Sequence, residues 1–138
     1  QKSFQDWIDN HHTLYILEAG LRLNNETDYN FNTDKLDKMI KYYQKNFLKN
    51  KKFPLFLNRM YVMDFHALGQ LLRMTEYGIY EFSEIEEVLN NWVKYFNKSK
   101  FPYRIYNFGV NRINYIRWTQ AFMFYGLSFY DRYGKEKG

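Results

Sequence analysis

The sequence has no cysteine, only two prolines, and no apolar run long enough to cross a membrane. Without cysteine, a disulfide framework and a thiolate metal site are both excluded. The most apolar stretch, residues 114–133, is interrupted by Arg117, Gln120 and Asp131, whereas a membrane span needs about 18 uninterrupted apolar residues. No signal peptide, nucleotide-binding glycine motif or serine-nucleophile motif is visible. The sequence therefore predicts a cytoplasmic protein without a membrane span.

Positive charge is present but spread along the chain. The formal net charge is +5, and the densest basic run is Lys49, Lys51 and Lys52 in a predicted loop. Most other lysines alternate with acidic residues, which is typical of a solvated surface rather than of a nucleic-acid interface. We therefore predict no nucleic-acid partner.

Aromatic residues are unusually common, at 22% of the chain with 14 Tyr and 13 Phe. One interpretation is the codon bias of an AT-rich genome. The other is a surface made for stacking on a planar ligand or on a sugar ring. The composition leaves both open.

The length of 138 residues predicts one domain, and hydrophobic periodicity predicts that it is helical. The N-terminal cap of the second helix is expected at Asn32 or Thr33, and that of the fourth at Ser83 with Glu86 completing a capping box. Residues 101–111 are predicted to form either a short hairpin or a packed loop, and residues 134–138 are predicted to form a flexible tail. The five predicted helices span residues 11–24, 34–48, 62–77, 83–96 and 114–133. The third is expected to stop near Gly78, and Gly126 is expected to let another helix approach the fifth closely.

A weak internal repeat organises these helices. Glu18, Gln70 and Gln120 lie about 50 residues apart, each near the middle of an odd-numbered helix, and such periods are typical of helical-hairpin arrays. The odd helices carry a polar stripe, whereas the even ones have one apolar and one charged face. The predicted fold class is thus all-α: an array of antiparallel helical hairpins forming a partial (α/α) toroid, with inner odd helices and outer even helices.

The stretch from Asp64 to Gln70 has the sharpest local pattern. Asp64 falls in the first turn of the third predicted helix, and His66 and Gln70 share one face of it. In a functional interpretation Asp64 is a general acid or base and His66 positions a substrate hydroxyl. In a structural interpretation Asp64 complements the helix dipole and His66 is a hydrogen-bonded core histidine.

A second constellation stands near the start of the fifth predicted helix. Arg117 suits bidentate binding of a carboxylate, Trp118 suits the apolar face of a sugar ring, and Gln120 adds an amide within the same turn. The alternative is a buried Arg117 paired with Asp64 or Glu18.

No metal or cofactor is predicted. His11 and His12 are adjacent and diverge by about 100° on a helix, so only one of them can face Glu18. Neither a His-x-x-x-His pair nor a carboxylate cluster accompanies them.

Three stretches together resemble a known group of proteins: residues 12–18, Asp64 to Gln70, and Tyr115 to Leu127. They resemble the C-terminal region of helical-toroid proteins of bacterial capsule and lipopolysaccharide clusters. Those proteins look related to the six-hairpin (α/α-toroid) carbohydrate-active enzymes, such as unsaturated-glucuronyl hydrolases and polysaccharide lyases. In this chain Gly69 and Gly126 stand where the pattern has alanine, and Phe122 stands where it has tryptophan.

The resemblance implies a carbohydrate-active or carbohydrate-binding module of bacterial surface-polysaccharide metabolism that acts on or binds an acidic oligosaccharide. Whether it is a hydrolase-like or lyase-like enzyme stays undecided. Catalytic roles are assigned to Asp64 and His66, and substrate binding to Glu18, Gln70, Arg117, Trp118 and Gln120. Because glycoside cleavage uses two carboxylates, Glu18 is the expected partner of Asp64.

The alternative function is a non-catalytic helical scaffold or protein-interaction module, in which the polar stripe is a structural network. Exposure of Trp118 in a cleft favours sugar binding, and its burial favours the scaffold. Because five helices form only part of a toroid, we expect either a preceding N-terminal portion or self-association with another copy.

Overall fold

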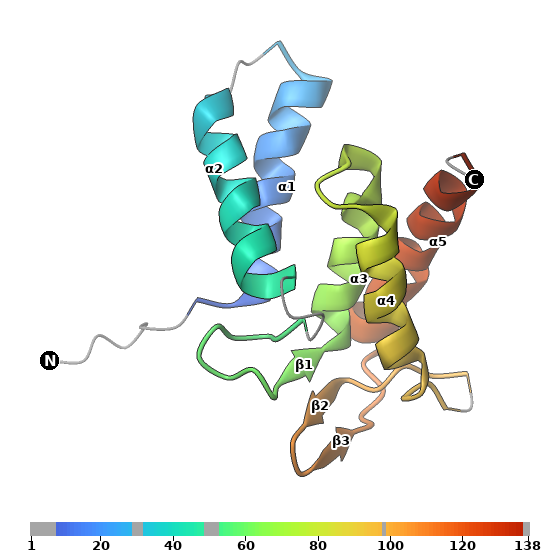
Figure 1. Cartoon of the computed structure of the whole chain (residues 1–138). Helices are drawn as coiled ribbons and strands as arrows, with labels where there is room; N and C mark the ends of the chain where they lie inside the picture. The colour runs from blue at the N-terminus through green and yellow to red at the C-terminus, as the bar shows by residue number, and fades with distance from the viewer. Residues whose placement is uncertain (1–7, 29–31, 49–52, 98, 137–138) are drawn as a thin grey trace, which may run out of the picture.

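The computed structural model describes residues 8–28, 32–48, 53–97 and 99–136. This part of the chain is mostly helical, with a small three-stranded sheet at one end (Figure 1). The run Lys49, Lys51 and Lys52 lies outside the described residues, as do residues 137–138 of the predicted tail. The elements are α1 Asn10–Glu26, α2 Thr33–Tyr43, β1 Met63–Asp64, α3 Phe65–Arg73, α4 Phe82–Val93, β2 Arg104–Tyr106, β3 Gly109–Asn111 and α5 Ala121–Glu136.

The first two helices form an antiparallel hairpin close to the predicted boundaries (Figure 1). Asp9 caps α1 by accepting a hydrogen bond of 2.8 Å from the backbone N–H of His12. Asn32 caps α2, as predicted. A π-helical turn, Gln44–Leu48, extends α2 to the predicted end at residue 48.

The third helix begins later than predicted. Residues 63 and 64 form strand β1, because Met63 and Asp64 pair with Ile105 and Arg104 of β2. Asp64 is therefore the N-cap of α3, with its side chain accepting from the N–H of His66 at 2.9 Å, and does not lie in the first turn. A 3-10 turn, Met74–Tyr77, follows α3 and ends at a left-handed glycine, as predicted.

The fourth helix starts one residue before its predicted first residue. The prediction of Ser83 and Glu86 as its capping box is wrong. Glu81 is the N-cap, and Glu84 completes the box by accepting from the Glu81 backbone N–H at 3.2 Å. Ser83 lies inside the first turn. The correction is small because both pairs have the same three-residue spacing.

Residues 101–111 form the hairpin alternative of the sequence prediction. Strands β2 and β3 pair in an antiparallel register, and β1 adds to β2 to give the sheet order β1-β2-β3. The sheet joins the chain just before α3 to the chain just before the last helix.

The fifth helix is shorter at its N-terminus than predicted. Residues 112–115 are not helical, Ile116–Gln120 is a π-helical turn, and regular α-helix starts at Ala121. The i→i+5 bonds of a π turn widen it, which rotates the residues before Ala121 relative to α5. The helix runs to Glu136, so residues 134–136 of the predicted tail are helical.

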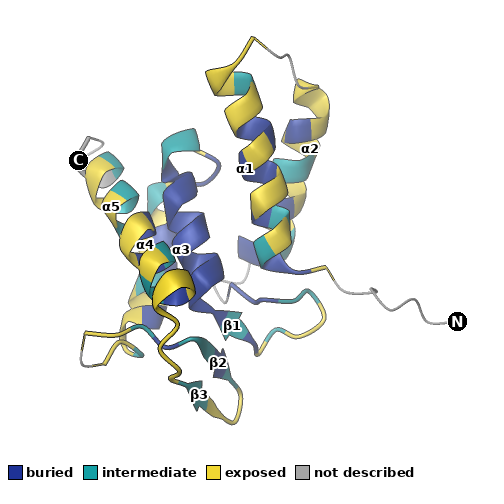
Figure 2. Cartoon of the chain, turned by 180° about the vertical axis from the view of Figure 1, so that it is seen from behind, coloured by how far each residue is buried: buried dark blue, intermediate teal, exposed yellow. Residues whose placement is uncertain are grey.

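Helix α3 occupies the middle of the domain, and all nine of its residues are buried (Figure 2). It contacts α1 on one side and α5 on the other, while α2 packs on α1. Helix α4 is joined to α3 by a contact between Phe65 and Trp92, and to α5 by a stack of Phe82 on Tyr130. Among the described residues, no helix is both long and apolar enough to span a membrane.

The contact between α3 and α5 is made by backbone at two glycines. A Cβ added to Gly69 would lie 2.5 Å from the carbonyl carbon and oxygen of Phe122, and one added to Gly126 would clash with the Gly69 carbonyl oxygen. The two glycines therefore belong together.

Candidate functional site

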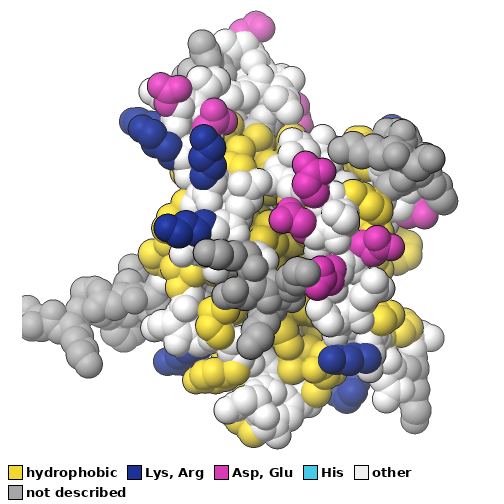
Figure 3. All heavy atoms as spheres, in the orientation of Figure 1, with side chains coloured by type: hydrophobic (Ala, Val, Ile, Leu, Met, Phe, Trp, Pro, Cys, Tyr) yellow, Lys and Arg dark blue, Asp and Glu magenta, His cyan; other side chains and the backbone are white. Residues whose placement is uncertain are grey.

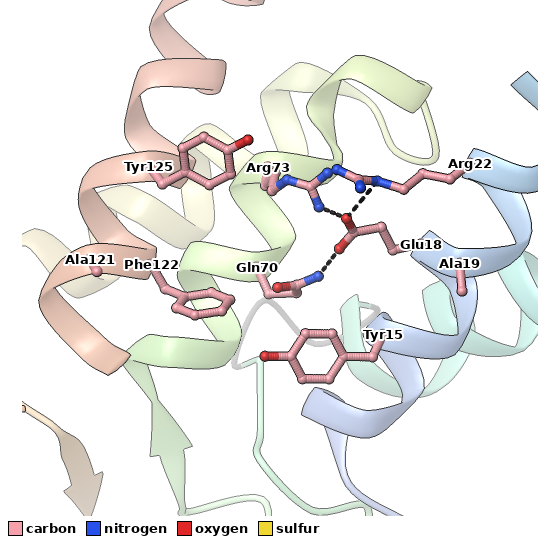
Figure 4. A pocket seen from close by; sticks show the side chains of 9 residues that line it. All are labelled: Tyr15, Glu18, Ala19, Arg22, Gln70, Arg73, Ala121, Phe122 and Tyr125. Carbon is pink, nitrogen blue, oxygen red and sulfur yellow. Dashed lines mark hydrogen bonds and ion pairs between the residues drawn. The ribbon is translucent and has the colours of Figure 1, made fainter. Parts of the chain in front are cut away.

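A cavity of about 520 Å³ lies between α1, α3 and α5 (Figure 4). We call it the Glu18 cavity, after the carboxylate that lies in it. The odd-numbered helices provide all of its lining, as the predicted polar stripe implied. Its lining residues are Tyr15, Glu18, Ala19, Arg22, Gln70, Arg73, Ala121, Phe122 and Tyr125.

Glu18 is the centre of a polar network in this cavity. Its Oε1 pairs with Arg22 Nε at 3.1 Å and with Arg73 Nη1, and its Oε2 accepts from the amide of Gln70. The Glu18 side chain is largely buried, so these partners compensate for the loss of its hydration. The structure thus brings Glu18 and Gln70, both assigned to substrate binding from the sequence, into contact.

Arg73 crosses from this network to the aromatic face of α5. Its guanidinium carbon lies 5.6 Å from the ring centre of Tyr125 and 5.9 Å from that of Phe129. Its Nη2 atom is buried without a hydrogen bond in the described part of the chain, and a carboxylate oxygen of Glu76 lies 3.8 Å from it. Arg73 therefore joins three helices through charge and aromatic contact.

A second cavity, of about 350 Å³, lies where the N-termini of α1 and α3 meet the turn before α5. We call it the Trp118 cavity. It contains Asp9 and Asp64, which cap α1 and α3, and the aromatic side chains of Tyr103 and Trp118. Its lining residues are Asp9, His11, His12, Leu55, Phe56, Asp64, His66, Tyr103, Arg104 and Trp118.

The two carboxylates of the Trp118 cavity are each engaged on both oxygens. Asp9 accepts from the backbone and Nδ1 of His12, at 2.8 and 2.7 Å. Asp64 accepts from the His66 backbone and from Arg104 Nε, the latter at 2.5 Å. Both carboxylates thus hold a helix N-terminus and a neighbouring side chain in place.

His66 forms the wall between the two cavities. Its Nε2 lies 3.2 Å from the Tyr15 hydroxyl, and its ring centre lies 3.8 Å from that of His11 and 3.9 Å from that of Phe122. Burial, with His11 and Arg104 nearby, lowers the pKa of His66 from 6.5 to about 3. Burial likewise lowers the pKa of His11. Both rings are therefore neutral near pH 7, and His66 can accept or donate one hydrogen bond without carrying charge.

Trp118 stands at the mouth of the second cavity. Its side chain is 60% exposed, and its ring lies 5.7 Å from His66 between ring centres. An exposed indole beside buried polar groups provides a flat apolar surface next to hydrogen-bonding partners. The prediction placed Trp118, Asp64 and His66 in one site, and the structure brings these three together.

Arg117 and Gln120 lie elsewhere. Gln120 is bonded through both amide atoms to the backbone of Phe101, which fixes the loop before β2. Arg117 is exposed and lines neither cavity. The expectation that a buried Arg117 pairs with Asp64 or Glu18 is wrong, because Arg104 and Arg73 take those places. Rotation of Arg117 by the π turn accounts for the difference.

Sequence reasoning missed Asp9, Arg73 and Arg104 as site residues. Arg73 stood on the same helical stripe as Gln70, so its spacing was available as a signal. Asp9 could have been found as the preferred cap type before the first helix. Arg104 had no local signal, because only the pairing of β1 with β2 brings it to Asp64.

The structure also separates the expected carboxylate pair. Glu18 lines one cavity and Asp64 the other, while Asp9 shares the second cavity with Asp64. The described residues contain no group of three His, Asp or Glu side chains arranged to hold a metal ion. The catalytic assignment of Asp64 and His66 stays a prediction.

Comparison with known proteins found no relationship. No protein-family model matches the sequence, and no curated protein or solved structure is significantly similar to it. The geometry of the two cavities is therefore the basis for any functional conclusion.

Proposed function

We propose that this chain is a carbohydrate-binding module whose oligosaccharide ligand lies across the Trp118 and Glu18 cavities. The observation that carries the proposal is the exposed indole of Trp118 at the mouth of a cavity lined by Asp64, His66 and Arg104. A sugar ring presents an apolar face and a rim of hydroxyls. An aromatic surface beside fixed hydrogen-bonding groups matches both.

The two cavities adjoin, which supports an extended ligand. Tyr15 lines the Glu18 cavity and is hydrogen-bonded to His66, which lines the Trp118 cavity. Tyr125 lies seven residues after Trp118, about two helical turns or 10 Å along the same segment. Both rings are exposed, so they can contact different sugar units of one chain.

The acidic character of the ligand rests on the arginines. Arg22 and Arg73 both face the Glu18 cavity and share one carboxylate oxygen (Figure 4). A guanidinium with further N–H groups suits a carboxylate on a uronic acid. The Trp118 cavity, with two carboxylates and Arg104, suits neutral hydroxyl-rich rings better.

Two further observations support a partial toroid of the capsule and lipopolysaccharide type. The odd helices α1, α3 and α5 line one cavity, and the even helices α2 and α4 pack on them from outside it. The residues quoted for the resemblance, Asp64 to Gln70 and Tyr115 to Leu127, contribute to both cavities.

We propose binding rather than catalysis because the side chains of both aspartates in the Trp118 cavity are already engaged by groups of the protein. A general acid must be free to approach the leaving group, whereas both oxygens of Asp64 are already engaged, one by the His66 backbone N–H and one by Arg104 Nε. If the module is hydrolase-like, the second carboxylate would be Asp9, which shares the Trp118 cavity with Asp64. Glu18 lines the other cavity.

The scaffold interpretation has one observation in its favour. The Glu18 network is satisfied within the protein, as a structural network would be. It does not account for the exposure of Trp118, since a scaffold residue of that size is expected to be buried or covered by a partner.

The test is isothermal titration of the protein with a panel of neutral and uronic-acid oligosaccharides. We expect saturable binding that Trp118→Ala weakens about five- to thirtyfold, because stacking of a sugar ring on an indole contributes on the order of 1–2 kcal/mol. Phe124→Ala is the matched control, since Phe124 is exposed on α5 and lines neither cavity.

Equal loss of affinity in both variants would reject a specific sugar surface at Trp118. A folded protein that binds no member of the panel would favour the scaffold.

A further inference from the structure

The basic and acidic residues are not distributed evenly along the chain. Between Val88 and Tyr130 the sequence has six of the 20 Lys and Arg residues and none of the 15 Asp and Glu residues. The remainder has 14 basic and 15 acidic residues and is nearly neutral. The excess charge of the protein therefore belongs to this one stretch. Its basic residues are Lys94, Lys98, Lys100, Arg104, Arg112 and Arg117.

The middle part of this stretch forms one end of the molecule. The β2–β3 hairpin projects from the helices, and residues 112–115 return from it to the start of the last helical segment (Figure 1). The acidic side chains visible in Figure 3 lie over the upper and middle parts of that face, whereas basic and hydrophobic side chains occupy the lower end. We call this end, residues 99–118, the hairpin surface.

The hairpin surface also exposes large apolar side chains. Phe108, at the tip between β2 and β3, is 85% exposed and stacks on Tyr106. Ile116 is 69% exposed, and Ile113 and Tyr115 are also exposed. Scattered single apolar residues are normal on a protein surface, but a group of this size beside unopposed basic residues indicates an interaction site.

Acidic groups do not neutralise this surface in the described structure. The two carboxylates near it, Asp9 and Asp64, are buried, and Asp64 is paired with Arg104. Lys100, Arg112 and Arg117 are exposed. Arg112 donates one hydrogen bond to the backbone carbonyl of Tyr95. The outer part of the surface thus carries net positive charge.

We propose that the hairpin surface docks the protein onto an anionic lipid bilayer. Basic residues are attracted to the negative potential of acidic headgroups, and aromatic rings favour the headgroup region. Exposed aliphatic and phenyl groups can insert among the upper acyl chains. No membrane-spanning helix is needed for this mode of binding. Tyr103, Arg104 and Trp118 belong both to the hairpin surface and to the Trp118 cavity, but the lipid proposal is argued from other exposed residues.

The exposed aliphatic side chains of the hairpin surface favour an anionic bilayer over a nucleic acid or an acidic polysaccharide as the partner. Single-stranded nucleic acids stack on aromatic rings and Arg planes, and an acidic polysaccharide likewise contacts rings and cations. Neither has a surface that would bury Ile113 and Ile116, which a bilayer provides. The exposed isoleucines therefore distinguish the lipid partner.

The test is co-sedimentation of the whole chain with lipid vesicles. We expect binding to phosphatidylcholine vesicles that contain about one third phosphatidylglycerol and little binding to pure phosphatidylcholine. Lys100→Gln with Arg117→Gln should lower the partition coefficient about thirtyfold, because each basic residue near an anionic surface contributes roughly a further fivefold. Phe108→Ala should lower it about tenfold through the loss of apolar insertion.

The matched control is Lys35→Gln with Lys38→Gln. This double variant removes the same charge from the exposed face of α2, away from the hairpin surface. It should bind vesicles as the wild type does. Equal loss in the two double variants would overturn the proposal, as would equal binding to both lipid compositions. Binding of single-stranded DNA in place of vesicles, lost on the same hairpin substitutions, would assign the surface to nucleic acid.

Discussion

The two sides of helix α3 are built in opposite ways. Toward α5 it presents Gly69, and the two backbones come into contact at Gly126. Toward α1 it presents Gln70 and Arg73, whose side chains reach Glu18 across a cavity. One side is closed by the absence of side chains, and the other is held open by long polar ones.

The comparison explains how a small domain can keep a polar cavity beside its core. The glycine contact fixes the position of α5 without using the polar stripe of α3. The network to α1 then orients charged groups toward the cavity at the cost of their hydration. The packing of α3 on α5 therefore depends on the small size of the two glycines. The packing of α3 on α1 depends on the charged side chains of the Glu18 network.

Glu18→Gln tests the charge dependence of the α1 side and should have the largest effect. It removes the carboxylate shared by two arginines, so the buried Arg73 loses its main partner. We expect a loss of about 3 kcal/mol in the free energy of unfolding, measured by urea denaturation. Glu26→Gln is the control, because Glu26 is exposed and lies 4.0 Å from Arg22; its change should stay within about 0.5 kcal/mol. Similar losses in both variants would reject the buried network as the source of stability.

Gly126→Ala tests the size dependence of the α5 side. The added methyl group meets the backbone of Gly69, so α3 and α5 must separate, and we expect a loss of about 2 kcal/mol. Gly109→Ala adds the same atom where nothing lies within 4 Å, and it should be nearly neutral. Thermal and urea unfolding would measure both. A neutral Gly126→Ala would show that the helices do not approach as closely as described.

The pH dependence of stability tests the histidine at the end of the α1 side. The pKa of His66 is about 3 in the folded chain, against an ordinary value of 6.5. Protonation therefore favours the unfolded chain, so stability is complete above pH 6.5 and is lost as the pH falls toward 3. We expect this protonation to lower the free energy of unfolding by about 1 kcal/mol between pH 7 and about pH 5.

Urea unfolding of wild type and His66→Gln at both pH values isolates this contribution from that of other titrating groups. The variant should lose less stability on acidification. A loss equal to that of the wild type would assign the pH dependence to other groups.

Arg117→Gln changes a residue that belongs to neither side of α3, and it should have the smallest effect on stability. Because Arg117 is exposed and lines neither cavity, the free energy of unfolding should change by less than about 0.5 kcal/mol. A loss above about 2 kcal/mol would restore the expectation of a buried, paired arginine.

Local patterns predicted much of the fold. The 3.6-residue periodicity placed five helices, and the left-handed Gly78 ended the third helical segment as expected. The polar stripe placed Glu18 and Gln70 on odd-numbered helices of one inner layer, and the structure brings the two side chains into contact. Gly126 was recognised as a place where helices approach closely, although its partner Gly69 was not.

The errors come from pairing over long distances in the sequence. The strand at Met63–Asp64 depends on β2, about 40 residues later, so helical periodicity alone extended α3 too far. The π turn at Ile116–Gln120 rotated Arg117 out of the stripe on which straight helical spacing had placed it. The basic stretch between Val88 and Tyr130 was also missed, because acidic residues elsewhere in the chain lower the net charge of the whole sequence.

The contact of Gly69 with Gly126 has a consequence for hydrogen exchange. Two backbones in direct contact cannot part slightly without losing the packing along their whole crossing, so the amides of α3 and α5 should exchange together, through one cooperative opening. Helix α2, which packs mainly on α1 and is exposed along most of its length, should exchange sooner. The slowest-exchanging amides would then lie in segments more than 50 residues apart in the chain. The last part of the protein to open would be formed by its middle and its C-terminal helix.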